Sequence, residues 1–226
     1  MRSRKKKYLV DRVEKVRDLM IFSDEKGFYD KPLNDRYNLF NLKEVFGNDN
    51  ITYLEIGCGK GGFITKLAQK YPNINFLAVE KTKNIIVSAM ETVSALGLDN
   101  IRFMNIDAYN LKFLLPNQCI DRIYLNFSCP YPKKTYANNR LTNPKFLEIY
   151  KMIMTPEAEI HQKTDSELLF EYSVEQFIAN GFALKNVTND LYKTTYFENI
   201  TTEYEEYFVA QGKPIFRLEA FITTKK

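Results

Sequence analysis

A chain of 226 residues, 45% apolar and 14% aromatic, is long enough to bury one substantial core and suits a single folded domain overall. No run approaches the roughly 18 apolar residues of a membrane span. The basic N-terminus also lacks the apolar segment that a signal peptide requires. We therefore expect a cytoplasmic protein that does not associate with membranes.

Cysteine and histidine are too sparse for a metal or disulfide framework. Cys58, Cys119 and Cys129 lie far apart without a Cys-x-x-Cys pair, and His161 is the single histidine. We expect His161 to be packed or hydrogen-bonded within a strand. The sequence predicts no metal cofactor.

The net charge of +4 is unevenly distributed, because five of the first seven residues are Arg or Lys. This tail has two interpretations, contact with nucleic acid phosphates or a solvated end. Behind it, Leu9, Val13, Val16 and Met20 recur at helical spacing and predict a helix over about residues 8–20. We predict that residues 1–50 are a basic tail and helical extension and that residues 51–226 form the main domain.

From residue 51 onward, strands alternate with helices. The predicted strands are "ITYLEIG" (51–57), "INFLAVE" (74–80), "NIRFMNID" (100–107) and "IDRIYLNF" (120–127). One helix follows the first strand, and another follows the second strand and ends at Gly97. This alternation predicts right-handed βαβ crossovers and a parallel sheet.

The second half continues the alternation and then departs from it. A helix is expected from Pro144, a strand over "AEIHQKTD" (158–165) and a further helix that Gly181 ends. The last two strands, 182–190 and 214–223, have no long helical pattern between them and should pair antiparallel at the sheet edge. We therefore predict an α/β protein with a doubly wound, Rossmann-like sheet that is mostly parallel and has an antiparallel last strand.

A glycine-rich turn joins the first strand of the main domain to its helix. Gly57, Gly59 and Gly61 permit positive φ and close backbone approach, as in nucleotide-binding turns. Glu55, two residues before the first glycine, would repel a pyrophosphate but can attract the amino group of a methionine-like moiety. The turn therefore favours S-adenosylmethionine over NAD.

Polar side chains end the following strands. Glu80 ends the second strand and suits hydrogen bonds to both ribose hydroxyls, whereas Asp107 ends the third and could reach an adenine amino group. Asn126 ends the fourth. Because ligands bind open α/β sheets at the carboxyl ends of the strands, these residues predict a cofactor site.

Six motifs in order carry a family resemblance over roughly residues 50–222. They are "YLEIGCGKGGF", "FLAVEKT", "NFSCPYPKK", "RLTNPKFLEIY", "KTDSELLFEYS" and "TEYEEYFVAQGKPIFRLE". The chain resembles the bacterial tRNA (guanine-N7)-methyltransferases of the TrmB type. The resemblance implies a class I methyltransferase fold with seven strands, and methyl transfer from S-adenosylmethionine to N7 of guanosine 46 in the tRNA variable loop.

The resemblance also assigns residues to two sites. The cofactor-binding positions are Glu55, Gly57, Gly59, Gly61, Glu80, Lys81, Asp107, Ala108 and Asn126. The substrate-binding positions are Lys133, Arg140, Asp165, Thr202, Glu203, Tyr204 and Glu205. The expected partner is tRNA, and the protein is expected to be a monomer or homodimer.

One departure falls on the catalytic position. The turn of the family usually reads Asp-Pro-Trp-Pro-Lys, and its Asp is assigned the catalytic role. Here Cys129 stands for the Asp and Tyr131 for the Trp. The basic run that usually follows the lysines is replaced by "TYANNR", in which only Arg140 is charged. Cys129 and Asp165 are the candidate catalytic residues.

The chemistry leaves three interpretations of Cys129 open. Guanine N7 holds an in-plane lone pair, so attack on a sulfonium methyl needs orientation and not a general base. Asp165 and Glu205 could supply enough carboxylate for an active enzyme. Alternatively, the chain is a catalytically impaired paralogue that binds S-adenosylmethionine and RNA, or it methylates a different RNA or a small molecule. Cys129 could also be a small buried side chain in a rigid turn.

Overall fold

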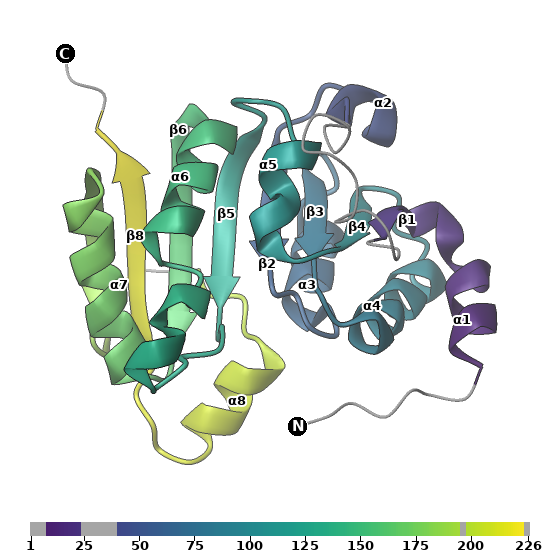
Figure 1. The fold of residues 1–226 in the computed structure, drawn as a ribbon. Coiled ribbons are helices and arrows are strands. Elements are labelled where there is room, and N and C mark those ends of the chain that lie inside the picture. Colours follow the sequence, from purple (N-terminus) through teal and green to yellow (C-terminus); the bar gives the residue numbers. More distant parts are fainter. Residues whose placement is uncertain (1–7, 24–39, 195–197, 224–226) are drawn as a thin grey trace. The chain divides into compact units, whose positions relative to one another are not determined.

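The computed structural model describes residues 8–23, 40–194 and 198–223. The basic tail at Lys5–Lys7 lies outside these ranges. The chain divides into two compact units, Met1–Pro116 and Asn117–Lys226, which are described separately (Figure 1). Among the described residues, no helix is both long and apolar enough to cross a membrane. The predicted division at residue 50 stays a prediction.

The first unit is built on a parallel sheet with the strand order β1-β4-β3-β2 (Figure 1). Its strands are β1 Met20–Ser23, β2 Thr52–Ile56, β3 Asn75–Val79 and β4 Ile101–Asn105. Its helices are α1 Leu9–Lys15, the 3-10 helix η1 Arg17–Leu19, α2 Leu42–Phe46, α3 Gly62–Lys70, α4 Lys83–Ala95, the 3-10 helix η3 Ala108–Asn110 and α5 Leu111–Leu114. The helices α3 and α4 connect successive parallel strands, as the alternation predicts.

The sequence of this unit explains its core. All five residues of β3 are buried, as expected for an apolar strand that is covered on both faces. Ile86, Met90 and Val93 recur on one face of α4 and have no exposed surface. Leu96, which the helical pattern includes, is 47% exposed because it caps the helix before Gly97. The strands of this unit are therefore held in a well-packed sheet, and so are the residues at their carboxyl ends.

The predicted helix over residues 8–20 is not continuous, because a separate 3-10 helix, η1, spans Arg17–Leu19 and Met20 belongs to a strand. The helix α1 ends at Lys15, and Met20 begins strand β1, which pairs parallel with β4. Val16 is the buried residue after α1, with φ of -125° and ψ of 19°, outside the helical region. Its spacing from Met20 fits a helix, but the pairing of Met20 with the sheet edge overrides that local pattern.

The second unit has the strand order β5-β6-β8-β7 (Figure 1). Its strands are β5 Ile120–Asn126, β6 Met154–Thr164, β7 Phe182–Thr188 and β8 Phe216–Ile222. Its helices are the 3-10 helix η4 Lys134–Asn139, α6 Pro144–Ile153, α7 Glu167–Ala179, the 3-10 helix η5 Leu191–Lys193 and α8 Glu203–Val209. Strands β5 and β6 are parallel, and β8 runs antiparallel to both β6 and β7, which confirms the predicted antiparallel last pair.

The two faces of β6 differ in chemistry. Gln162 donates to Ser173 Oγ of α7 at 2.9 Å, so this face lies under the helix. Alternate residues of a strand point to opposite faces. Glu159, His161 and Lys163 therefore share the other face of the strand. The face with Glu159, His161 and Lys163 is charged, whereas the face that contacts α7 carries apolar and neutral polar side chains.

Candidate functional site

The glycine turn of the first unit has the backbone that the sequence predicts. Gly57, Gly59 and Gly61 have φ of 80°, 57° and 79°, a region that residues with a Cβ rarely adopt. The amide nitrogens of Gly57 and Cys58 both donate to the carbonyl oxygen of Val79, at 2.8 and 3.0 Å. The turn is therefore fixed to the end of β3.

The predicted cofactor carboxylates lie at the ends of adjacent strands in this unit. Glu55 is buried within β2, Glu80 directly follows β3 and Asp107 lies two residues after β4. One oxygen of Glu80 accepts from the amide of Thr82 at 2.8 Å. One oxygen of Asp107 accepts from the amide of Tyr109 at 3.0 Å. These bonds hold the two side chains at the strand ends.

Three further cofactor assignments fall at the same kind of position. Lys81 is exposed next to Glu80, and Ala108 is buried next to Asp107. Asn126 is the last residue of β5 in the second unit and is buried. Their roles in cofactor binding stay predictions.

The three cysteines have different environments. Cys58 is buried, and this burial raises the pKa of its thiol well above the usual range, with Glu55 and Glu80 adding to the effect. Burial raises the pKa of Cys119 to about 12. Cys129 is exposed, so the interpretation of this residue as a buried filler is wrong.

Cys129 lies in a turn between two residues with left-handed backbone. Phe127 has φ of 48° and Tyr131 has φ of 41°, both unusual for aromatic side chains. The amide of Phe127 donates to the carbonyl oxygen of Lys163 at 2.8 Å, which continues the pairing of β5 with β6. The turn thus starts from the sheet and projects Cys129 toward solvent. Such strain is common at functional sites.

Arg140 holds this turn in place through two hydrogen bonds to its backbone. Its Nε donates to the carbonyl oxygen of Pro130 and its Nη2 to that of Tyr131, both at 3.0 Å. The guanidinium also lies over the ring of Tyr172, 4.4 Å from the ring centre. Arg140 is only 6% exposed. Its observed contacts position the turn, whereas a direct contact with substrate stays a prediction.

Asp165 lies directly after β6, at the same edge as the Cys129 turn because β5 and β6 are parallel. Its side chain is 23% exposed, and the ammonium of Lys213 lies 3.7 Å from Oδ2. Such a carboxylate can accept hydrogen bonds from a base. Asp165 is therefore an accessible carboxylate at the strand edge that carries Cys129.

The predicted substrate stretch forms the start of helix α8. The hydroxyl of Thr202 caps the helix by accepting from the amide of Glu205 at 2.9 Å. Glu203 and Tyr204 are exposed, whereas Thr202 and Glu205 are buried. The four neighbouring residues therefore divide into two that face solvent and two that hold the segment in place. Lys133, which belongs to the Cys129 turn region, is also exposed.

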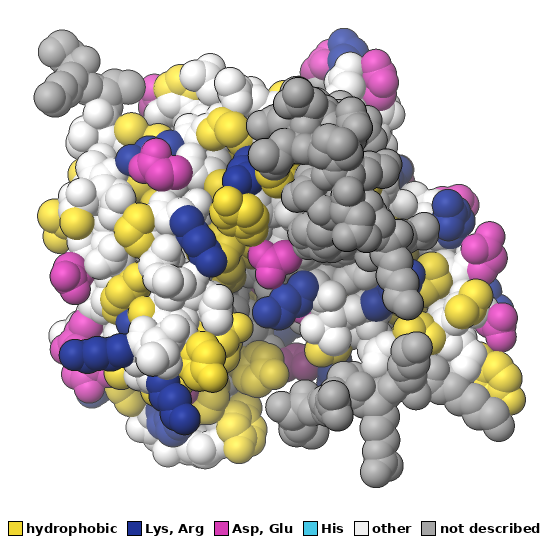
Figure 2. Space-filling model, viewed as in Figure 1, with side chains coloured by type: hydrophobic (Ala, Val, Ile, Leu, Met, Phe, Trp, Pro, Cys, Tyr) yellow, Lys and Arg dark blue, Asp and Glu magenta, His cyan; other side chains and the backbone are white. Residues whose placement is uncertain are grey.

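Aromatic rings connect α8 to the Cys129 turn. The ring of Phe127 is stacked with those of Tyr204 and Phe208, with centroids 6.4 and 6.0 Å apart. Figure 2 shows hydrophobic side chains gathered where α8 lies in Figure 1, and Tyr204 and Tyr207 are more than 60% exposed. An exposed aromatic surface of this kind can stack on nucleic acid bases.

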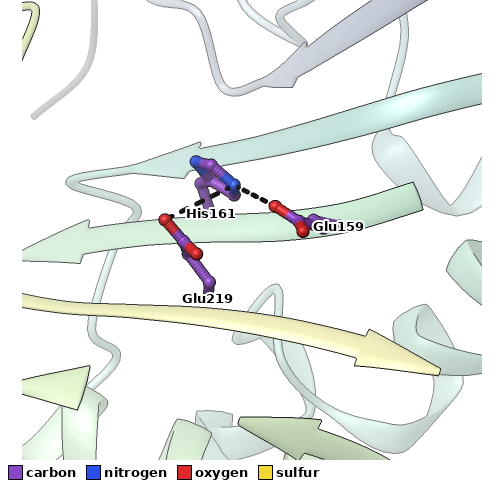
Figure 3. A group of neighbouring side chains, drawn as sticks. All are labelled: Glu159, His161 and Glu219. Atoms are coloured by element: carbon purple, nitrogen blue, oxygen red, sulfur yellow. Dashed lines mark hydrogen bonds and ion pairs between the residues drawn. The ribbon is translucent and has the colours of Figure 1, made fainter. Parts of the chain in front are cut away.

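His161 belongs to a charged group on the face of β6 opposite the one that contacts α7 (Figure 3). Its Nε2 lies 2.9 Å from Glu159 Oε2 and 3.7 Å from Glu219 Oε1. Both carboxylates also face cations, because Lys185 pairs with each of them and Arg217 with Glu219. These three residues offer metal-ligand atoms close together. The surrounding cations already balance the carboxylates, and His161 is hydrogen-bonded within its strand, as predicted.

Sequence reasoning did not single out Lys163 and Phe127, which the structure places beside the candidate site residues. Both lie in the quoted motifs, but a lysine and a phenylalanine at strand ends are ordinary in isolation. The signal that would have found them is the parallel register of β5 and β6, which places Asn126 opposite Lys163. That register is not readable from one strand alone.

Comparison with known sequences places these features in a family. A family model described as "Putative methyltransferase" matches residues 49–218. The chain is 43% identical over 199 residues to the tRNA (guanine-N(7)-)-methyltransferase of Brevibacillus brevis, covering 88% of this chain and 92% of that protein. It is 37% identical over 225 residues to the protein of the same name from Bacillus cytotoxicus, covering 100% and 99%.

Solved structures agree on the fold. The structure of an antibiotic-related methyltransferase covers 84% of this chain and 99% of its own, with a TM-score of 0.60 at 18% identity. A SAM-dependent methyltransferase from Aquifex aeolicus covers 93% and 98%, with a TM-score of 0.56 at 18% identity. These matches confirm the predicted α/β class I methyltransferase fold. By its sequence, this chain belongs to the tRNA (guanine-N7)-methyltransferase family.

Proposed function

We propose that the protein transfers a methyl group from S-adenosylmethionine to N7 of a guanosine in tRNA, and that this base is guanosine 46 of the variable loop. The observation that carries the proposal is the likeness to relatives of that name over nearly the full length of both chains. No metal takes part in the proposed reaction. The position of the base rests on the family resemblance of the sequence motifs.

The first unit offers residues that fit the cofactor. A Cβ built on Gly57 or Gly59 would meet no atom within 4 Å, so the turn has open space beside its backbone. Glu80 and Asp107 are half-buried acceptors at adjacent strand ends, as hydrogen bonds to ribose hydroxyls and an adenine amino group require. S-adenosylmethionine would supply an electrophilic methyl group on a sulfonium.

The second unit would position the base. Guanine N7 already holds the electron pair that forms the new bond, so the protein has to align N7 and stabilise the positive charge of the methylated purine. Asp165 would accept hydrogen bonds from the guanine edge. Tyr204 would stack on the base, and Lys133 would contact a phosphate. Cys129, exposed in its turn, would lie beside the base without taking a proton.

A second candidate function is tRNA and cofactor binding without efficient transfer. Cys129 favours it, because a thiol is a poorer hydrogen-bond acceptor than the carboxylate it replaces. The location of Glu205 adds to this, since its buried carboxylate cannot replace the missing one at the surface. In this alternative the turn has the shape needed to hold tRNA, but the rate of methyl transfer is low.

The test is methyl transfer from labelled S-adenosylmethionine to unmodified tRNA, with the product located by nuclease digestion. We expect N7-methylguanosine from the natural protein, and product formation at least as fast from Cys129→Asp. A tRNA with adenosine at position 46 should accept no label, which tests the choice of base. Product from Cys129→Asp alone would favour the second candidate, and labelled tRNA from neither protein would refute the proposed activity.

A further inference from the structure

Glu205 is enclosed by donors from three segments of the second unit. Its Oε2 accepts from Lys163 Nζ at 2.5 Å, and its Oε1 accepts from the hydroxyl of Tyr192 at 2.9 Å and from the side-chain amide of Asn199. The side chain has no exposed surface. Burial and the bond to Glu205 raise the pKa of Tyr192 to about 12, so its hydroxyl remains a donor at neutral pH.

Lys163 is the centre of this group. Its side chain is 7% exposed, and its ammonium donates to Glu205, to Asn199 Oδ1 at 3.1 Å and to the carbonyl oxygen of Ile200 at 2.9 Å. The ammonium therefore fixes both the segment before α8 and the first turn of the helix. A buried charge with this many partners is expensive to disturb.

The backbone of Lys163 holds a second part of the candidate acceptor site, the Cys129 turn. The carbonyl oxygen of Lys163 accepts from the amide of Phe127, which begins the Cys129 turn. The ring of Phe127 then stacks on Tyr204, one residue before Glu205. One residue of β6 thus holds the turn through its main chain and α8 through its side chain, and Asp165 follows two residues later.

We infer that Lys163 is a positioning residue of the methyl-acceptor site, and that Glu205 acts through its ion pair with Lys163 instead of touching the guanine. The inference rests on the proposed function and narrows it, because it assigns the direct contacts to Asp165, Glu203 and Tyr204. It changes the role that the family resemblance implies for Glu205.

The ion pair offers a test because its two halves depend on each other. Removing one partner leaves the other as an uncompensated buried charge, whereas replacing both by neutral side chains of similar size removes that penalty. A carboxylate that contacted substrate would behave differently. Its loss could not be repaired by a second change at Lys163.

The experiment compares Lys163→Met, Glu205→Gln and the double variant with the natural protein. We expect each single change to lower kcat/KM for tRNA by at least about tenfold, and the double variant to recover most of that loss. The KM for S-adenosylmethionine should change by less than about twofold in all of them. The exposed pair of Lys151 and Glu148 supplies the control, since Lys151→Met should leave kcat/KM unchanged.

A double variant as impaired as Glu205→Gln would overturn the inference, because it would show that the carboxylate itself is needed. If a single variant does not fold, the double variant alone decides, and its kcat/KM should stay within about tenfold of the natural protein. If the natural protein makes no N7-methylguanosine, the proposed function fails. The same four proteins are then compared by their Kd for tRNA, where unchanged affinity in the single variants would refute the positioning role.

Discussion

Cys129 stands in a turn whose backbone is held by contacts that do not involve its own side chain. The turn has two positive-φ residues, accepts two hydrogen bonds from Arg140, and places the ring of Phe127 against α8. These features position whatever side chain stands at 129. In the proposed transfer to N7, which depends on alignment, such a frame would retain much of the catalytic value even where the acceptor at position 129 is weak.

His161 provides a prediction about stability and pH. Burial lowers its pKa below the usual 6.5, with further lowering from Arg122 and Arg217 against the opposing effect of Glu159 and Glu219. The folded protein therefore binds fewer protons than the unfolded chain just below pH 6.5, so stability falls as the pH drops through this region. The thermal midpoint should decrease from pH 7 to pH 5, and His161→Gln should reduce that decrease.

The chain has a single histidine, so a loss of stability between pH 7 and pH 5 can be assigned to His161 by one substitution. At lower pH, Glu159 contributes a second loss of stability. The hydrogen bond from His161 helps to lower the pKa of the Glu159 carboxyl to about 2. That contribution is present above pH 4.5 and disappears as the pH falls toward 2. Calorimetry measures the thermal midpoint of both proteins at pH 7 and pH 5. An equal decrease in His161→Gln and in the natural protein would contradict the assignment of this pH dependence to His161.

At the scale of elements, the approach of α3 to α4 depends on Gly61. An added Cβ would lie 2.7 Å from the Cβ of Ala89 in α4, and φ at this position is 79°. Gly61→Ala should lower the thermal midpoint and weaken S-adenosylmethionine binding by about tenfold, since the cofactor turn would have to shift. Thermal unfolding and a calorimetric titration measure the two effects.

Gly97→Ala is the matched control, because Gly97 also has positive φ but a Cβ there would meet nothing within 4 Å. Both variants carry the cost of a left-handed alanine, about 1–2 kcal/mol, and only Gly61→Ala adds the clash. Equal losses of stability and full cofactor affinity in both variants would show that the close helix approach is unimportant.

The parts of the fold that the sequence predicts are those with a local signal. The strands ending near Glu55, Glu80 and Asp107 are apolar runs bounded by turn residues, and Pro144 opens α6 with Asn143 as its cap. Met20, the last residue of the predicted N-terminal helix, is instead the first residue of β1, a strand that pairs with β4. Local patterns cannot report such pairing.

The same limit applies to the site. The sequence identifies Thr202–Glu205 as one stretch, but helical geometry exposes Tyr204 and buries Glu205 against Lys163, 42 residues away. Which residues of a motif face the ligand depends on partners that are distant in the chain.

For the whole molecule, the charge distribution predicts how tRNA affinity depends on salt. Replacing Lys5, Lys6 and Lys7 by Ala should weaken tRNA binding and reduce the slope of log K against log salt concentration by roughly 2, because fewer counterions are released from RNA phosphates. Binding titrations over a series of salt concentrations measure this slope. An identical slope for both proteins would reduce the basic tail to a solvated end.

The exposure of Cys129 gives this protein a chemical handle that an aspartate at the same position would not provide. Cys58 is buried and Cys119 is partly buried, and the pKa values of both thiols are raised, so a thiol-directed reagent should react first at Cys129. A tRNA carrying a disulfide-activated tether near the target guanosine could therefore be captured covalently at this turn. Under the proposed function, a cysteine at this position would permit a complex with tRNA to be trapped without engineering the protein.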